Sequence, residues 1–247
     1  MTIDFEFLDS FERKRVLIVD DDAFILGVLE KLLNMLGIES VLRAGDGVEA
    51  LTVLAEQAVD LVISDVQMPN LDGLSMLKQI RMGRASAPAN LPCIIVTSLE
   101  EEAVLGAAMQ LDANGFVQKP FKTPILIKRL LVALSETIVE VPGHSYSDVV
   151  IDLQKVALTE SVHSTGQSHQ SQHIPLERDE KFTLVSLFQL RSDMQLAEDI
   201  KTKSGTVLLS AGFTLNEARV HRMWELENNL EKTSFRVIGG WTMGSGS

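Results

Sequence analysis

Short apolar runs alternate five times with segments of helical periodicity between residues 15 and 137 of this 247-residue chain. The runs are rich in Val and Ile and short enough to predict buried strands. We expect strands at Val16–Asp20, Glu39–Ala44, Leu61–Asp65, Cys93–Thr97 and Gly115–Gln118. We expect helices at Ala23–Leu36, Gly47–Gln57, Leu74–Arg81, Glu100–Leu111 and Thr123–Thr137. This alternation predicts an α/β domain: a doubly wound, five-stranded parallel sheet with helices on both faces.

Acidic, hydroxyl and amino side chains stand at the carboxyl ends of the expected strands. They are Asp20, Asp21, Asp65, Thr97 and Lys119. In an open parallel sheet the carboxyl ends of the strands border one crevice, so residues far apart in sequence meet there. The sequence therefore predicts a single polar site at that edge.

Three acids in one site would repel one another, and a divalent cation with oxygen ligands relieves that repulsion. Mg²⁺ is the expected ion, with Asp20 and Asp21 holding it and Asp65 serving as both ligand and nucleophile. An aspartate oxygen can attack a phosphoryl group to form an acyl phosphate. The metal and the Lys119 ammonium would neutralise charge on the phosphoryl oxygens.

Local signals also mark two helix ends and the environment of the cysteine. Asp22 is predicted to cap the helix that begins at Ala23 rather than to bind the metal. Gly37 is a suitable left-handed residue after that helix. Cys93, the single cysteine, lies in an apolar run and is predicted to be a buried strand residue.

The motifs of residues 15–137 occur in the order found in the receiver domains of two-component response regulators, which this part of the chain resembles. They are Val19-Asp20-Asp21, Asp65 with Met68-Pro69 and Asp72-Gly73, Thr97-Ser98 and Lys119-Pro120-Phe121. The resemblance implies a flavodoxin-like receiver fold in which Asp65 is the phosphoacceptor. It also implies a sensor histidine kinase or phosphotransfer protein as partner.

The same resemblance assigns roles to further residues. Asp20 and Asp21 become metal-binding acids, and Gln67 supplies a backbone carbonyl to the metal. Thr97 becomes the hydroxyl that moves toward the phosphoryl group, and Phe116 the aromatic residue that switches with it. Because Phe116 lacks a hydroxyl group, a switch that depends on a tyrosine hydrogen bond is not expected here.

Composition restricts the class of protein and partner. The formal net charge of −12 and the pI near 4.9 disfavour nucleic acid as a partner, because an acidic surface repels phosphate backbones. No run approaches the roughly 18 apolar residues of a membrane helix, and the N-terminus lacks a signal peptide pattern. We expect a soluble cytoplasmic protein that does not associate with membranes.

Around the receiver-like region we expect further segments. Residues 1–14 form an N-terminal extension, residues 138–181 a linker with a possible helix at 148–158, and residues 241–247 a tail that resembles a cloning remnant. Residues 182–240 are predicted to form a small, strand-rich α+β domain for output or interaction.

Within that small domain the pattern predicts several strands and one helix. The expected strands are Phe182–Leu190, Leu196–Ile200, Thr206–Leu209 and Ser234–Ile238. Thr214 and Glu217 form a capping-box pattern for a helix over Leu215–Asn228. Val220, Met223 and Trp224 would lie on one face of that helix.

Residues 190–215 resemble a module that accompanies cyclic-dinucleotide phosphodiesterases of the HD-GYP family. The catalytic part of such enzymes has an adjacent His-Asp pair and a Gly-Tyr-Pro triplet, and the chain contains neither. We therefore expect a non-enzymatic output that signals through protein contacts or self-association, for example with a downstream partner or in a homodimer. A cyclic-dinucleotide function is the alternative, and a DNA-binding regulator ranks last because the expected helix at 215–228 mixes basic with acidic residues.

Overall fold

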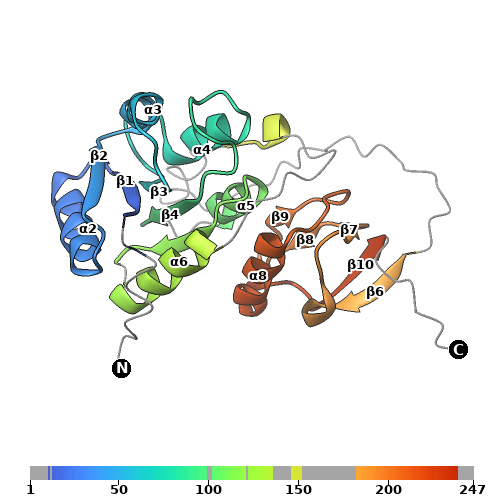
Figure 1. The fold of residues 1–247 in the computed structure, drawn as a ribbon. Helices are drawn as coiled ribbons and strands as arrows, with labels where there is room; N and C mark the ends of the chain where they lie inside the picture. Colours follow the sequence, from blue (N-terminus) through green and yellow to red (C-terminus); the bar gives the residue numbers. More distant parts are fainter. Residues whose placement is uncertain are drawn as a thin grey trace, which may run out of the picture.

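Two folded units make up the part of the chain that the computed structural model describes (Figure 1). The described residues are 11, 13–98, 102–120, 122–135, 146–151 and 182–238. The first unit ends at residue 135, and the second covers residues 182–238. The predicted tail at 241–247 and most of the predicted extension and linker lie outside these residues.

A five-stranded parallel sheet forms the centre of the first unit. Its strands are β1 (Arg15–Val19), β2 (Ser40–Ala44), β3 (Leu61–Asp65), β4 (Cys93–Thr97) and β5 (Gly115–Gln118). The strand order is β2-β1-β3-β4-β5, and all neighbouring pairs are parallel. The order changes direction between β1 and β3, and ligands of open α/β sheets bind at the carboxyl side of such a switch point.

Helices cover both faces of this sheet. They are α2 (Ala23–Met35), α3 (Gly47–Glu56), α4 (Gly73–Arg81), α5 (Glu102–Gln110) and α6 (Thr123–Ser135). Alternate residues of a strand point to opposite faces. Leu17 and Val19 of β1 accordingly pack with α3, α4 and α5, whereas Val16 and Ile18 pack with α2 and α6.

The predicted doubly wound, flavodoxin-like sheet is confirmed, and element ends differ from expectation by one or two residues. Asp22 caps α2 as predicted: its side chain accepts a hydrogen bond from the Phe24 N–H at 2.8 Å. Gly37 has a φ of +90°, the left-handed conformation expected after this helix. Phe11, from the predicted extension, is fully buried against the α2 and α6 side of the core.

The second unit contains short antiparallel strands and one α-helix, so the strand-rich α+β prediction is confirmed. Its elements are β6 (Thr183–Ser186), β7 (Gln195–Leu196), β8 (Ile200–Lys201), β9 (Val207–Leu209), α8 (Glu217–Glu225) and β10 (Ser234–Ile238). One sheet has the order β6-β10-β7, and β8 pairs with β9. Met223 of α8 and Phe235 of β10 are fully buried in its core.

Several predictions for the second unit are wrong in detail. The first strand ends at Ser186, where the chain turns into a 3-10 helix at Leu187–Gln189. The strand expected at Leu196–Ile200 is divided, because β7 and β8 belong to different sheets.

The capping prediction for α8 is also wrong. Asn216, and not Thr214, is the N-cap, since the Asn216 side chain accepts from the Arg219 N–H at 2.7 Å. Thr214 instead forms a β-bridge with Gln195. The helix ends at Glu225; of the three residues expected on one face, Val220 and Met223 are buried and Trp224 is 37% exposed.

A short segment after the first unit packs against it. Tyr146–Asp148 is a 3-10 helix, and residues 149–151 are not helical, so the helix predicted at 148–158 is absent from the described part of that range. The Lys78 ammonium of α4 donates to the carbonyl oxygens of Ser147 and Val149, each at 2.8 Å. These bonds hold the segment against α4. Residues 152–158 lie outside the described residues.

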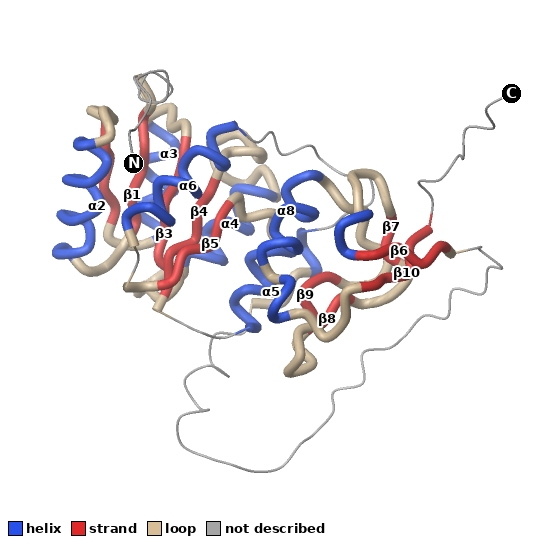
Figure 2. Tube along the Cα trace, turned by 90° about the horizontal axis from the view of Figure 1, so that it is seen from below, coloured by secondary structure: helices blue, strands red, loops and turns tan. Residues whose placement is uncertain are grey.

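The two units contact each other through α5, α6 and α8 (Figure 2). Met109 of α5 is buried in the core cluster of the second unit, and Leu105 packs against it. A Cβ atom added at Gly106 would lie 2.7 Å from the Val207 carbonyl oxygen of β9. The absence of a side chain at Gly106 therefore lets α5 approach β9 closely.

None of the helices in the described ranges has the length and apolar character required to cross a membrane.

Candidate functional site

The carboxyl edge of the sheet brings together the acids and the lysine that the sequence singled out. The Lys119 ammonium lies 2.7 Å from Asp20 Oδ2 and 3.0 Å from Asp65 Oδ2. Asp20 Oδ1 accepts from the Asp22 N–H at 2.9 Å, and Asp65 Oδ1 accepts from the Val66 N–H at 2.7 Å. One oxygen of each buried carboxylate is thus fixed by the backbone, and the other faces Lys119.

Burial changes the pKa values of Asp65 and Lys119. Asp20 is 2% exposed and Asp65 is 8% exposed. Burial raises the pKa of Asp65, while the Lys119 ammonium and the Val66 N–H oppose that rise. Burial tends to lower the pKa of Lys119, but hydrogen bonds and attraction from Asp20 and Asp65 raise it overall. Lys119 is therefore held as a cation between two carboxylates.

The acids also have an arrangement that fits a metal ion. One carboxylate oxygen from each of Asp20, Asp21 and Asp65 lies within 4.8 Å of the others, and Asp21 is exposed to solvent. Three carboxylates and one ammonium leave negative charge in excess. A hard divalent cation such as Mg²⁺, which takes one or two carboxylates and keeps several waters, fits this donor set.

The remaining predicted residues border the same edge. Thr97 ends β4 and is fully buried, and its carbonyl oxygen accepts from the Lys119 N–H at 2.7 Å. Phe116 lies on β5, is partly buried and packs against the α3 to α5 side of the core. Gln67 is exposed two residues beyond Asp65. The roles of Gln67, Thr97 and Phe116 in binding or switching stay predictions.

Gly73 lies against the backbone of Asp65. This contact explains why the sequence motif has a glycine at this position. A Cβ atom at Gly73 would lie 1.9 Å from the Asp65 carbonyl oxygen and 2.7 Å from Ser64 Oγ. The Asp72 side chain caps α4 by accepting from the Ser75 N–H at 2.8 Å. Gly73 therefore allows the start of α4 to pack directly on the backbone of Asp65.

A second charged cluster joins the two units, and no sequence pattern predicted it. The Asp112 carboxylate, 1% exposed, accepts from Arg219 Nη2 at 2.8 Å, from the Tyr146 hydroxyl at 2.9 Å and from Asn216 Nδ2 at 3.2 Å. Its donors come from α8 and from the segment that follows the first unit. Burial and the Asp112 charge raise the pKa of Tyr146.

Arg81 extends this cluster into the first unit. Its guanidinium is buried and donates to the carbonyl oxygens of Ala89, Leu91, Leu111 and Asp112. Asp112 precedes Asn114-Gly115, so in sequence it resembles an ordinary turn residue. Its φ of +52° is a weak sign of a special position, but no sequence pattern links it to Arg219.

The chain is similar to several known proteins. Residues 16–131 match the family model described as "Response regulator receiver domain". The chain is 32% identical over 173 residues to "Response regulator MprA" from Mycobacterium sp. (strain KMS), covering 70% of each protein. It is 36% identical over 130 residues to "Probable transcriptional regulator ycf27" from Guillardia theta, covering 53% of this chain and 49% of that protein.

The chain spans about half the length of the ycf27 relatives from Guillardia theta and Cyanophora paradoxa. Among solved structures, the "Francisella response regulator 1452 receiver domain" is 30% identical, with a TM-score of 0.45. That match covers 49% of this chain and 97% of the other.

Proposed function

Because the chain belongs to the response regulator family, we propose that Asp65 accepts a phosphoryl group in a two-component system and that the second unit reports the change. The observation that carries this proposal is the placement of Asp65 beside Lys119 within a cluster of three acids. A receiver implies a sensor histidine kinase or a phosphotransfer protein as the donor.

The chemistry of transfer follows from the positions of the side chains. The Asp65 oxygen that faces Lys119 attacks phosphorus and an O–P bond forms. The P–N bond of a donor phosphohistidine, protonated at its other ring nitrogen, breaks, and neutral imidazole leaves. Lys119 faces that oxygen and would offset charge on the transferred group. Asp20, Asp21 and Asp65 would hold Mg²⁺, which would supply further positive charge against the transferred group.

The route from this site to the second unit is short. Thr97 ends β4, from which the chain continues to α5, and α5 carries Leu105 and Met109 into the core of the second unit. A change at Thr97 or Phe116 would therefore alter the surface on which the second unit rests. We propose that phosphorylation shifts the equilibrium between this packed arrangement and a separated one.

We also propose that the output is not enzymatic. Among the described residues, one group of acidic, histidine or cysteine side chains could hold a metal ion. It consists of Asp20, Asp21 and Asp65 and lies in the first unit. Reading of DNA by α8 has little support in this arrangement, since Arg219 and Arg222 are 0% and 7% exposed. The signal would then pass through protein contacts or self-association.

Hydrogen exchange of the full chain with Mg²⁺, with and without beryllofluoride, tests the proposal. The expected result is altered protection around Asp65 and Lys119 that extends through α5 into α8. Asp65→Asn is the matched variant, and beryllofluoride should leave its exchange unchanged. A change confined to the first unit would show that the second unit does not report phosphorylation, and no change in the wild-type chain would remove Asp65 as the acceptor.

A further inference from the structure

A cavity of about 790 Å³ lies between the two units. Its wall combines residues of α5, β5 and α6 from the first unit with residues of α8 from the second. Small-molecule sites commonly have volumes of about 300–1,000 Å³ and often lie at domain interfaces. The size and place of this cavity are those of a ligand site.

Cationic side chains dominate the polar part of its wall. Among the described residues, Lys122, Arg129 and Arg222 line the cavity together with one carboxylate, Glu225, which is paired with Arg129. Lys119 also reaches the wall, but its ammonium is shared by Asp20 and Asp65. Local positive charge is unexpected in a chain with a formal net charge of −12, and it favours an anionic occupant.

The rest of the wall is largely apolar. Leu105, Met109, Phe116, Ile125 and Leu226 contribute to it. Guanidinium groups bind oxyanions through paired hydrogen bonds, and an aromatic wall suits a flat ring. A simple inorganic ion would use the charges but leave the apolar surface in contact with water.

We propose that this cavity binds a small organic oxyanion that carries a ring, with the anionic group at Lys122, Arg129 and Arg222 and the ring against Phe116 and its apolar neighbours. Such an occupant touches α6 on one side and α8 on the other, so it holds the two units together. A ligand that binds only the packed arrangement stabilises that arrangement by mass action.

The effect of such a ligand on signalling rests on the proposed function. Lys119 borders both the cavity and the Asp65 site, and Phe116 of the same strand and loop lines the cavity. If phosphorylation of Asp65 separates the units, the ligand opposes it, and coupling between two sites is reciprocal. The ligand would then weaken the response of α8 to beryllofluoride.

Calorimetric titration of the full-length Asp65→Asn chain without Mg²⁺ tests binding separately from phosphorylation. The probes are phenyl phosphate, benzoate, inorganic phosphate and benzyl alcohol. We expect saturable one-site binding of at least one ring anion, at least roughly tenfold tighter than that of inorganic phosphate or the neutral alcohol, a difference of about 1.4 kcal/mol. A preference between phenyl phosphate and benzoate would identify the class of oxyanion.

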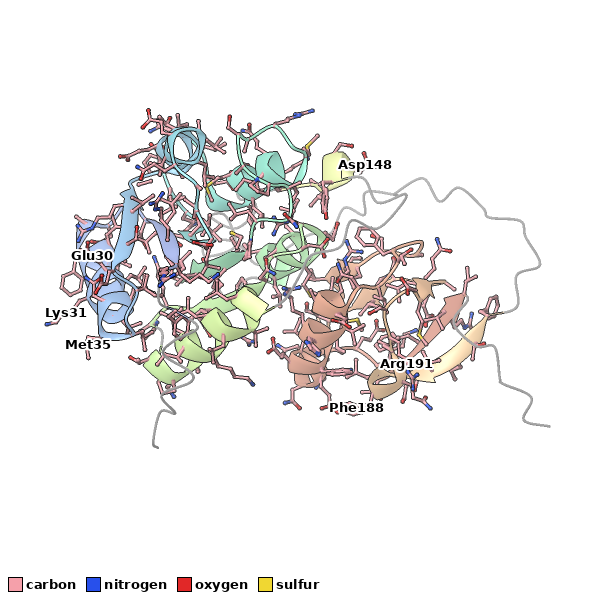
Figure 3. The ribbon with its side chains drawn as sticks, in the orientation of Figure 1. Glu30, Lys31, Met35, Asp148, Phe188 and Arg191 are labelled. Atoms are coloured by element: carbon pink, nitrogen blue, oxygen red, sulfur yellow. The ribbon has the colours of Figure 1, made fainter. Side chains whose placement is uncertain are left out.

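Variants of the wall distinguish this cavity from any other site. Lys122→Met and Arg129→Gln should each weaken binding of the ring anion several-fold, whereas Glu225→Gln should strengthen it or leave it unchanged. Lys31→Met is the control, because Lys31 is exposed on α2, on the side of the molecule away from α8 (Figure 3). Absence of ring-anion binding, equal binding of benzyl alcohol, or affinities unchanged by Lys122→Met would overturn the proposal.

Discussion

The Asp65 site and the Asp112 cluster lie at opposite ends of the strands of the same sheet, and their charge balance differs. At the carboxyl edge, Asp20 and Asp65 share one ammonium, and the neighbouring Asp21 remains exposed. At the amino edge of β5, one buried carboxylate receives three donors. Uncompensated charge open to solvent marks a place for a ligand, whereas compensated buried charge marks a structural connection.

Removing one partner of the buried Asp112 cluster should have the largest effect on the free energy of unfolding. Arg219→Met removes the ion-pair partner of the buried Asp112 carboxylate, and breaking a buried ion pair costs about 3–5 kcal/mol. We expect this cost to appear in denaturant unfolding as weaker packing of the second unit on the first. The double variant Arg219→Met with Asp112→Leu should recover much of it, because no charge is then left unpaired. A single variant as stable as the wild type would show that the cluster does not join the units.

The next largest effect should be that of Mg²⁺, which we expect to bind at the Asp65 site and not at the Asp112 cluster. Mg²⁺ at roughly 100 times its dissociation constant should stabilise the wild-type chain by about 2.7 kcal/mol. Thermal unfolding with and without Mg²⁺ measures this, and Asp20→Asn should reduce the gain. Arg219→Met should retain the gain if the two sites are independent. An equal gain in Asp20→Asn and in the wild-type chain would place the ion elsewhere.

Gly73→Ala should displace the backbone of Asp65. The added methyl group would lie 1.9 Å from the Asp65 carbonyl oxygen, so α4 or β3 must move. Overpacking of this kind costs about 1–3 kcal/mol, and we expect slower phosphorylation of Asp65 as well. Gly27→Ala in α2 is the control, since nothing lies within 4 Å of the added atom. That substitution should stabilise the helix by about 0.5–1 kcal/mol.

The smallest expected effect is a change in the titration of Tyr146, the single tyrosine of the chain. Burial and the Asp112 carboxylate raise the pKa of Tyr146 in the folded protein. Its contribution to stability is therefore complete below the unfolded pKa of about 10 and is lost as the pH rises through the folded pKa. Ultraviolet difference spectroscopy reports tyrosinate directly.

Asp112→Asn should lower the pKa of Tyr146 because it removes the negative charge beside the hydroxyl group. Asp148→Asn is the matched control: Asp148 is exposed near Tyr146 in sequence and does not contribute to its shift (Figure 3). Equal titration of the Asp112→Asn variant and the wild-type chain would contradict the assigned contact.

Agreement between prediction and structure is greatest where local pattern and chemistry coincide. β3, β4 and β5 have the predicted bounds, because each is a short apolar run closed by a polar residue. In the second unit, β10 also has the predicted bounds, whereas the two-residue strands β7 and β8 carry too little periodicity to define register. The division of 196–200 between two sheets and the cap at Asn216 depend on pairing with distant segments.

The sequence by itself determined the parallel sheet and placed Asp20, Asp21, Asp65, Thr97 and Lys119 at its carboxyl edge, because strand period and strand ends are local properties. Only the tertiary structure decided that Asp112 meets Tyr146 and Arg219, residues 34 and 107 positions away. It also decided that α8 closes a cationic cavity against α6. Such contacts depend on how two units pack, and packing is set by the shapes of whole surfaces rather than by any short run of residues.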